Sequence, residues 1–388
     1  MVRTEEPGVD KIAALEVFPF ILPMRGDFRI ARGSVLAGHG GRTVVLVKVT
    51  TERGLVGWGE GSPSVRWSYE TIDSVVSVLR HYIGPSITGH PISDFDGLHR
   101  KMNTVVAPAF SVGQPIAKAA VDMALHDVLG QALGIPVNEL WGYRRSGYIT
   151  LSWTVAVHHP AEAGQAVAAG KERGYRHFNV KLGHGLAGDV EICQVVRRLA
   201  PDSFLWGDAN GAYTGHEALK VGLSLAEIGL DAYEQPVAAN RLTTWMKLAE
   251  QLPVPVIVDE TVCSPVELTE LIRLNAIDGL AAKVTRTGGL FPARLCAEIV
   301  DAAGLMLLCS GLTETGVGLA ASAHLAAAFG IKYPCALNGP QYLADDILAV
   351  PLPIDGDILT LPKGAGLGVE VDEEKVRHYV DKSALPMG

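Results

Sequence analysis

Five ionisable residues follow one another along the chain at a nearly constant interval, and each closes a short apolar run. In order they are Lys181, Asp208, Glu234, Asp259 and Lys283. An interval of about 25 residues accommodates one strand, one helix and two short loops, which is the repeating unit of a parallel β/α barrel. The carboxyl ends of parallel barrel strands open at one mouth, so we expect the five side chains to converge there.

The sequence from residue 148 onwards repeats this alternation of strand and helix. Strands are expected at 150–155, 177–182, 204–208, 231–235, 254–259, 279–284, 305–309 and 335–338. Amphipathic helices are expected between them, at 161–173, 188–199, 215–227, 241–251, 265–274, 290–303 and 317–328. The pattern predicts a TIM-like (β/α) barrel, which we place in residues 141–350.

The first part of the chain does not follow the barrel interval. Strands rich in valine and leucine are expected at 13–20, 43–50 and 55–59, and helices at 69–82, 94–103 and 115–133. An antiparallel meander followed by helices indicates a separate α+β domain, which we place in residues 1–140. The polar, turn-rich residues 351–388 are expected to pack back on this domain.

The composition excludes several classes of protein. The net charge is −9 and no basic run occurs, so we expect no nucleic-acid partner. The longest stretch of small apolar residues, Gly316 to Phe329, is too short to cross a bilayer, and the first residues lack the apolar core of a signal peptide. The five cysteines show no CxxC spacing, which is typical of reduced thiols. We therefore expect a cytoplasmic protein without a membrane partner.

Three acids at neighbouring strand ends favour a site for a hard divalent cation. Asp208, Glu234 and Asp259 offer carboxylate oxygens, which Mg²⁺ prefers as ligands, and Mn²⁺ is the other option. A cation bound there can absorb the negative charge that develops when a proton is removed next to a carboxylate. The triad therefore predicts proton abstraction from a small carboxylate substrate.

Lys181 and Lys283 lie beyond the two edges of this triad, so they would face each other across it. A lysine in a cationic, partly dry pocket has a lowered pKa and can act as a base near neutrality. With one lysine on each face of the substrate, one can remove a proton and the other can return one.

The five residues belong to longer motifs. These are the second strand ending in Lys181, and then Asp208–Asn210, Glu234–Pro236, Asp259–Thr261, Lys283–Gly289 and Gly316–Leu325. As a set, they resemble the enolase superfamily and, within it, the muconate lactonizing enzyme (muconate cycloisomerase) subgroup. The resemblance covers nearly the whole chain. It implies a capping domain over the barrel, one essential Mg²⁺, acid/base lysines on the second and sixth strands, a substrate-covering loop around residues 25–29, and a homo-oligomer.

Departures from the family patterns reduce the range of substrates that we expect. Asn179 stands where the family usually has the first lysine of Lys-x-Lys, so only Lys181 can act as the base on the second strand. On the eighth strand, Ala336 and Asn338 replace the Asp-x-Asp of the dipeptide epimerases that this chain resembles, which counts against a dipeptide. Muconate cycloisomerases tend to carry an acid where Ala336 lies, so that assignment is weakened too. Lys283 disfavours the mandelate racemase subgroup, which has an Asp–His pair on strands six and seven.

Further residues are expected to bind the substrate or to support the groups that do. They are Asn179, Asn210, Glu260, Arg286, Glu314 and Asn338. Four of them also have a structural alternative: a turn former for Asn210, a loop hydrogen-bonder for Glu260, a support of its own loop for Arg286 and a solvated loop acid for Glu314.

Three functions are compatible with these residues. The first is a Mg²⁺-dependent isomerase, either a racemase/epimerase or a cycloisomerase, that abstracts a proton alpha to a carboxylate and stabilises an enolate. The second is a dehydratase of a small hydroxy or amino acid such as a hydroxyproline. A neutral residue at Asn338, together with a single lysine on the second strand, also resembles the pattern of enzymes that act on hydroxyproline-type substrates. The third is a non-catalytic metal-binding barrel, against which the retention of both lysines and all three acids counts.

Overall fold

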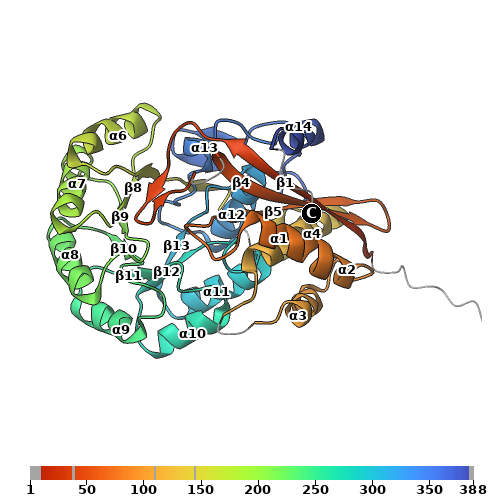
Figure 1. Ribbon diagram of the computed structural model, residues 1–388, viewed down its shortest axis with the longest axis horizontal. Coiled ribbons are helices and arrows are strands. Elements are labelled where there is room, and N and C mark those ends of the chain that lie inside the picture. The colour runs from red at the N-terminus through yellow and green to blue at the C-terminus, as the bar shows by residue number, and fades with distance from the viewer. Residues whose placement is uncertain (1–9, 37–39, 109–110, 144–145, 384–388) are drawn as a thin grey trace, which may run out of the picture.

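The computed structural model describes residues 10–36, 40–108, 111–143 and 146–383 (Figure 1). It contains an antiparallel sheet with helices packed on it and a curled sheet of parallel strands with an outer ring of helices (Figure 1). The predicted class, a TIM-like α/β barrel with an N-terminal α+β domain, is therefore confirmed.

The N-terminal domain is built on three antiparallel strands in the order β1-β4-β5. These are β1 (Ile12–Pro23), β4 (Gly41–Thr51) and β5 (Val56–Gly61). Its helical segments are α1 (Ile72–Val78), η1 (Leu79–Ile83), α2 (Gly84–Ile87), α3 (Phe95–Val105), α4 (Pro115–Leu133) and α5 (Val137–Leu140). Helix α4 lies directly against β5 because Gly59 has no side chain, and a Cβ there would lie 1.9 Å from the Ala120 carbonyl oxygen.

Seven parallel strands follow one another around the barrel in sequence order. They are β7 (Trp153–Val155), β8 (Phe178–Lys181), β9 (Leu205–Asp208), β10 (Ala232–Glu234), β11 (Val256–Val258), β12 (Gly279–Ala282) and β13 (Met306–Cys309). The outer helices are α6 (Pro160–Glu172), α7 (Leu186–Leu199), α8 (Gly215–Glu227), α9 (Leu242–Gln251), α10 (Pro265–Arg273), α11 (Leu290–Ala302) and α12 (Gly316–Phe329).

The predicted eighth strand, 335–338, is wrong as a regular strand. Cys335 and Ala336 make only isolated parallel bridges, to Leu151 on one side and to Ser310 on the other. These bridges still close the ring between β13 and β7. The segment cannot extend further because Asn338 already begins the short helix α13 (Gly339–Tyr342), which has a proline in its first turn.

The predicted first barrel strand, 150–155, is also corrected, because it is split in two. Strand β6 (Tyr148–Thr150) pairs antiparallel with β15 (Ile358–Thr360), which forms a hairpin with β14 (Ile354–Asp355). Only β7 joins the barrel, where it pairs with β8.

The last helix, α14 (Glu373–Ser383), packs on β1 of the N-terminal domain. The rings of Tyr379 and Phe20 stack with centroids 6.2 Å apart, and Lys48 forms an ion pair of 2.6 Å with Glu373. We propose that the N-terminal domain ends at residue 140 and the barrel domain at residue 350.

Glu60 of β5 connects the N-terminal domain to the barrel. Its Oε1 accepts hydrogen bonds from Ser62 Oγ and from the Thr315 N–H, at 2.7 and 3.0 Å. Its Oε2 accepts from Thr315 Oγ1 at 2.6 Å and from the Gly318 N–H at 2.9 Å. Because Thr315 and Gly318 lie at the start of α12, this buried carboxylate satisfies backbone donors that the helix cannot satisfy itself.

Within the described ranges, no helix combines the length and the apolarity that crossing a bilayer requires. All five cysteines are buried and form no disulfide.

Candidate active site

The strands bring the five predicted residues to one level of the barrel interior. In the register of β8, β9 and β10, Lys181 lies opposite Asp208, which in turn lies opposite Glu234. Asp259 follows the last residue of β11, and Lys283 follows the last residue of β12. All five are at least 95% buried, with exposed fractions between 1% and 5%. The expected convergence of these residues on one site is confirmed.

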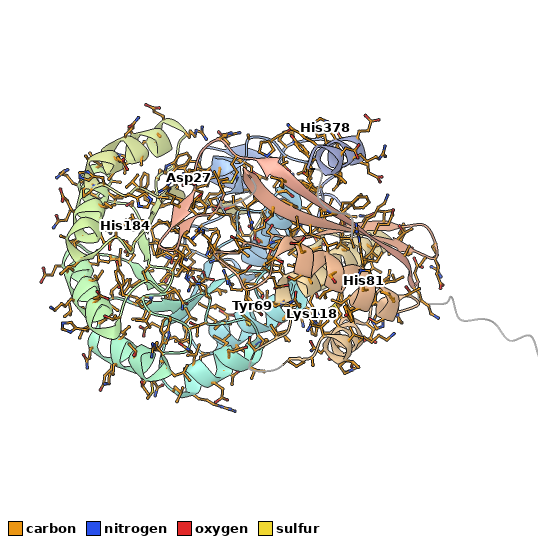
Figure 2. All side chains as sticks on the ribbon, in the orientation of Figure 1. Asp27, Tyr69, His81, Lys118, His184 and His378 are labelled. Carbon is orange, nitrogen blue, oxygen red and sulfur yellow. The ribbon has the colours of Figure 1, made fainter. Side chains whose placement is uncertain are left out.

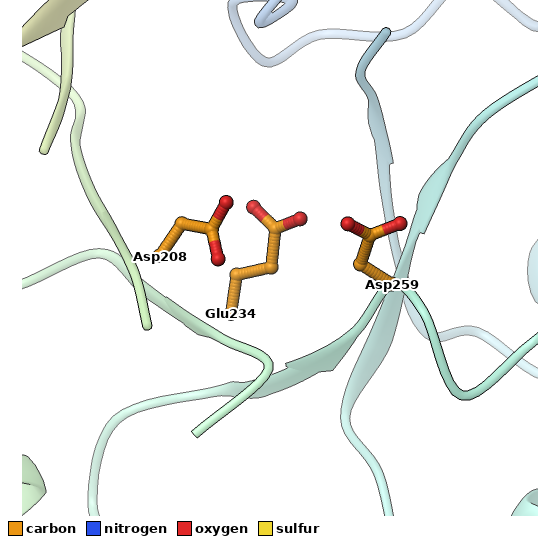
Figure 3. A group of neighbouring side chains, drawn as sticks. All are labelled: Asp208, Glu234 and Asp259. Atoms are coloured by element: carbon orange, nitrogen blue, oxygen red, sulfur yellow. The ribbon is translucent and has the colours of Figure 1, made fainter. Parts of the chain in front are cut away.

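The three acids fit a divalent cation. One carboxylate oxygen from each of Asp208, Glu234 and Asp259 lies within 4.8 Å of the other two, and Figure 3 shows the groups side by side at the strand ends. Glu234 Oε1 and Asp259 Oδ1 are buried and accept no hydrogen bond, although Lys283 Nζ lies 3.6 Å from the first and Arg286 Nε 3.2 Å from the second. Buried carboxylate oxygens that accept no hydrogen bond are costly, and a metal ion coordinated by them would remove that cost. The donor set is all carboxylate oxygen, which suits Mg²⁺ or Mn²⁺.

Each lysine forms an ion pair with the acid at its own edge of the triad. Lys181 Nζ lies 2.5 Å from Asp208 Oδ2. Lys283 Nζ contacts Asp259 Oδ2 and lies 3.6 Å from Glu234 Oε1. The two ammonium groups therefore flank the triad from opposite sides.

The pKa values of Glu234 and Asp259 are shifted in opposite directions by the groups around them. Burial and the neighbouring Asp208 raise the pKa of Glu234 well above its usual value. The pKa of Asp259 is about 2, because Lys283 and Arg286 outweigh the opposing effect of burial. Three carboxylates this close favour a proton on one of them, and a bound divalent cation would replace that proton.

The expected lowering of the lysine pKa is wrong for Lys283 in this arrangement. Burial lowers its pKa, but the carboxylates of Asp259 and Glu234 outweigh burial and hold the pKa above the usual value. Arg286 does lower the pKa of this lysine, as a neighbouring cation should, but the anions around Lys283 have the larger combined effect. A divalent cation on the triad would offset those anions and reduce the upward shift.

Three of the predicted supporting residues adjoin the triad. The Asn210 N–H donates to Asp208 Oδ1 at 2.9 Å, and the Asn210 amide donates to Glu260 Oε1 at 3.2 Å. Arg286 Nε lies 3.2 Å from Asp259 Oδ1. Burial and the adjacent Asp259 raise the pKa of Glu260 to about 7. These contacts are consistent with residues that hold the acids in place.

The other three predicted supporting residues lie deeper in the barrel or in its loops. Asn179 is one layer below Lys181, opposite Trp206. Glu314, in the loop after β13, accepts a hydrogen bond from Thr285 Oγ1 at 3.2 Å. Asn338 accepts one from Thr313 Oγ1 at 2.8 Å. None of the three contacts a triad acid through a hydrogen bond within the described part of the chain.

Trp67, Phe28 and Tyr342 form an aromatic cluster next to the two lysines. From the sequence, only Phe28 was expected near the site, as part of the loop at residues 25–29. Lys181 Nζ lies 5.2 Å from the Trp67 ring centroid and 5.8 Å from that of Phe28, and Lys283 Nζ lies 5.5 Å from the Trp67 ring. Phe28 stacks on Tyr342 with centroids 4.5 Å apart. Both lysines therefore face aromatic rings, an environment that favours cations and excludes water. Trp67 follows β5 in a segment without periodicity, so the only sequence signal was a tryptophan among polar residues.

The loop that contributes Phe28 also contains the hairpin of β2 (Arg29–Ile30) and β3 (Gly33–Ser34). Its tip rests on the loop after β8, where a Cβ at Gly183 would lie only 2.7 Å from Ala31 Cβ. Asp27 of this loop and His184 of the barrel are labelled on the same side of the molecule in Figure 2. The hairpin thus covers the mouth at the Lys181 side, as the resemblance implied for residues 25–29.

Two family descriptions match most of the chain. "Mandelate racemase / muconate lactonizing enzyme, N-terminal domain" matches residues 15–142, and "Enolase C-terminal domain-like" matches residues 161–375. Muconate cycloisomerase 1 of Rhodococcus opacus is 32% identical over 379 residues, covering 95% of this chain and 98% of that protein. N-succinyl-L-Arg/Lys racemase of Bacillus cereus is 28% identical over 369 residues, covering 95% of this chain and 97% of the racemase.

Solved structures give the same result. The crystal structure of the Bacillus cereus racemase superposes with a TM-score of 0.88 at 28% identity, covering 95% of this chain and 98% of that one. The muconate lactonizing enzyme of Pseudomonas fluorescens complexed with muconolactone has a TM-score of 0.88 at 26% identity, covering 96% and 100%. The dipeptide epimerase of Enterococcus faecalis complexed with Mg and L-Leu-L-Tyr has a TM-score of 0.86 at 26% identity, covering 93% and 99%.

The barrel, the domain that covers it and the buried Asp208–Glu234–Asp259 metal site agree with these matches. The chain is an enzyme of the mandelate racemase/muconate lactonizing enzyme family, within the enolase superfamily.

Proposed function

We propose that this protein is a Mg²⁺-dependent racemase or epimerase that moves a proton at the carbon alpha to the carboxylate of a small substrate. The observation that carries this proposal is the placement of Lys181 and Lys283. Each is buried, and each is paired with an acid at an opposite edge of the triad. A carboxylate anchored between them presents one face of its α-carbon to each ammonium group.

The chain's own groups account for the proton transfer. One lysine, in its neutral form, removes the α-proton from its face, and the other, as a cation, delivers a proton to the opposite face. Trp67 lies over both amines and Phe28 over that of Lys181, which limits proton exchange with bulk water during the reaction. When bound by Asp208, Glu234 and Asp259, Mg²⁺ supplies positive charge that stabilises the enolate. Lys283 and Arg286, which both contact Asp259, lower the pKa of that acid and keep it ionised for this role.

The test is deuterium exchange in D₂O with Lys181→Ala and Lys283→Ala, read by NMR on a substrate found by screening. Each variant should lose net turnover but still exchange the α-proton of one enantiomer, and the two variants should act on opposite enantiomers. Lys220→Ala, which removes an exposed lysine, is the matched control and should behave as the parent does. Equal loss of exchange for both enantiomers in both variants would contradict a two-base reaction.

A one-base cycloisomerisation is the second candidate, and the surroundings of Lys283 favour it. Lys283 contacts Asp259 and lies near Glu234, and its pKa is raised, so it could remain a cation that stabilises charge while Lys181 acts alone. In that case only Lys181→Ala would abolish exchange. The same NMR spectra distinguish a dehydratase, because elimination of a hydroxyl group gives an unsaturated or keto product.

We also propose that the protein is cytoplasmic, because its cysteines are typical of reduced thiols, and, from the family resemblance, that it is a homo-oligomer. Light scattering at working concentration tests the oligomeric state, and a monodisperse monomer would contradict a homo-oligomer.

A further inference from the structure

Two histidine side chains meet at the rim of the barrel mouth. His158 lies in the loop after β7, and His184 lies in the loop after β8. Their Nδ1 atoms are 3.2 Å apart, and their ring centroids are 4.5 Å apart with an angle of 71° between the ring planes. His158 is exposed and His184 is half-buried. The pair is therefore accessible to ions in solution.

The distance between the two nitrogens suits a shared metal ion. Two imidazole nitrogens at about 2.0–2.1 Å from a tetrahedral Zn²⁺ lie roughly 3.3–3.4 Å from each other. The same pair also fits an N–H···N hydrogen bond, in which a single proton takes the position of the ion. A metal ion binds the neutral imidazole, and burial lowers the pKa of His184, which favours its neutral form.

The backbone that carries His184 is held in place by a buried acid, Asp189. Its carboxylate accepts hydrogen bonds from the N–H groups of Gly183, His184 and Gly185, at 3.0–3.2 Å. Three successive backbone donors are thus fixed by one side chain. A ligand on a fixed backbone loses little conformational freedom when it binds an ion.

The chemistry of the donors distinguishes this pair from the metal triad. The triad offers carboxylate oxygens, which suit Mg²⁺, whereas imidazole nitrogens suit Zn²⁺, Cu²⁺ and Ni²⁺. His159, which follows His158, has a different role, because its Nδ1 accepts a hydrogen bond from the Ala161 N–H at 3.2 Å and caps α6. The two sites are therefore expected to take different ions.

The hairpin of β2 and β3 rests on the loop that carries His184. Ala31, at the tip of the hairpin, is so close to Gly183 that a Cβ at Gly183 would lie 2.7 Å from Ala31 Cβ. Because Gly183 directly precedes His184, an ion on this histidine would lie beside the contact between hairpin and barrel.

Asp27, in the segment that leads into β2, brings a negative charge to the same rim. Its carboxylate contacts Arg29 and Ser34, which fix it within the hairpin. Asp27 also interacts electrostatically with His158, and Figure 2 shows Asp27 and His184 on the same side of the molecule. A divalent cation bound by the histidines would attract this carboxylate, and the hairpin with it, towards the barrel.

We propose that His158 and His184 form a second metal site, selective for transition cations such as Zn²⁺ over Mg²⁺. The two Nδ1 atoms chelate the ion, and water molecules complete its coordination. The bound ion holds the β2–β3 hairpin against the loop after β8. The site uses no residue of the Asp208–Glu234–Asp259 triad, and ion binding there is independent of which reaction the enzyme catalyses.

The first experiment is a calorimetric titration of the full chain with Zn²⁺, in an excess of Mg²⁺ that keeps the triad occupied. His158→Asn and His184→Asn should each raise the Kd for Zn²⁺ by roughly tenfold or more and leave the Kd for Mg²⁺ unchanged. His216→Asn, at an exposed position of α8, is the matched control and should bind Zn²⁺ as the parent does.

A spectroscopic probe identifies the ligands directly. With Cu²⁺ in place of Zn²⁺, pulsed electron paramagnetic resonance should show couplings to two imidazole nitrogens, and each variant should lose one of them. The triad offers only oxygen ligands, so a spectrum without nitrogen couplings would place the ion in the triad and overturn the proposal. Parent-like Zn²⁺ affinity in both variants, or an equal loss in His216→Asn, would show adventitious binding and also overturn it.

The effect on the hairpin is measured by hydrogen–deuterium exchange of residues 27–34, again in excess Mg²⁺. Zn²⁺ should slow this exchange in the parent and leave it unchanged in His158→Asn and His184→Asn. Unchanged exchange in a parent that binds Zn²⁺ would overturn the role of the ion in holding the hairpin. The unfolding midpoint without Zn²⁺ is measured for every variant. A lowered midpoint together with parent-like Zn²⁺ affinity would show that the histidines only form a structural hydrogen bond.

Discussion

The metal triad and the Glu60 junction are both buried clusters of charged groups, but they use their hydrogen-bonding capacity differently. At the junction, each oxygen of Glu60 accepts two hydrogen bonds from Ser62 or from the start of α12. In the triad, Glu234 Oε1 and Asp259 Oδ1 have no hydrogen-bond partner. A cluster satisfied within the protein stabilises the fold, whereas one with unsatisfied anionic oxygens is completed by a ligand.

The arginines next to the two clusters, Arg42 and Arg286, differ in the same way. The Arg42 guanidinium is 1% exposed and lies next to the junction, where it donates to the carbonyl oxygens of Leu312, Pro63 and Ser62 at 2.6–2.8 Å. Arg286, at the triad, is also buried and donates to the Trp67 carbonyl oxygen through both terminal nitrogens, at 3.2 and 3.3 Å. Its Nε, in contrast, has no hydrogen-bond partner, although it lies 3.2 Å from Asp259 Oδ1. The junction therefore holds the domains together, while the triad keeps part of its polar capacity for the reaction.

The largest expected effect comes from Glu234→Gln, which removes one of three charged ligands from the triad. We expect kcat to fall roughly 10⁴-fold, equivalent to about 5.5 kcal/mol of transition-state stabilisation, because the cation is held less firmly and the enolate loses its charge partner. The unfolding midpoint without metal should not decrease, since Glu234 is already driven towards its neutral form. Calorimetric Mg²⁺ titration and steady-state kinetics measure both effects.

The matched control for this variant is Glu227→Gln, at an exposed position of α8. If Glu234→Gln binds Mg²⁺ and turns over as the parent does, the assignment of the triad is wrong.

The second effect should appear in stability. Glu60→Ala removes the carboxylate that satisfies the start of α12 and leaves its buried donors unpaired, so we expect a loss of about 4 kcal/mol in the free energy of unfolding. Urea unfolding followed by circular dichroism measures the loss. Mg²⁺ affinity of the folded protein should remain close to that of the parent, because Glu60 does not contact the triad.

Glu60→Gln is the informative companion variant, because it keeps the shape of the side chain and one acceptor oxygen. It should lose less stability than Glu60→Ala. A parent-like midpoint in Glu60→Ala would show that the domains are held together elsewhere.

A smaller effect should appear in the pH dependence of stability. It comes from a buried residue that supports the fold and lies outside the metal site. His324 of α12 is fully buried between Asn138 and the Leu367 carbonyl oxygen, and burial lowers its pKa from 6.5 to about 4. Between these values the unfolded chain binds a proton that the folded protein excludes. Stability should therefore fall by up to about 3 kcal/mol as the pH decreases from 6.5 to about 4.

Urea unfolding across this pH range tests the effect, with His324→Gln as the variant. The variant should show a shallower pH dependence, whereas His378→Gln, at an exposed position of α14, should keep the parent slope. An unchanged slope in His324→Gln would mean that other groups cause the acid sensitivity.

Several features could be predicted from the sequence because they depend on repetition. Lys181, Asp208, Glu234, Asp259 and Lys283 recur at the interval of the βα unit, and parallel strands of equal length place equivalent positions at one level. Local signals such as apolar runs and helix caps were enough to place the strands and helices within a few residues. The eighth segment was an exception, because Asn338 and Pro340 start a helix where the interval required a strand.

The remaining features required contacts between residues far apart in the chain. Trp67 of the N-terminal domain meets Lys181 and Lys283 of the barrel only after the domains pack, and no periodicity marks it. The pKa of Lys283 depends on how many anions surround it in three dimensions, and spacing along the chain does not give that number. The sequence by itself thus determined which groups meet at the metal site, since a regular repeat converts spacing into position. Only the tertiary structure decided which surrounding groups are satisfied and which are free, because hydrogen bonds depend on distances that packing sets.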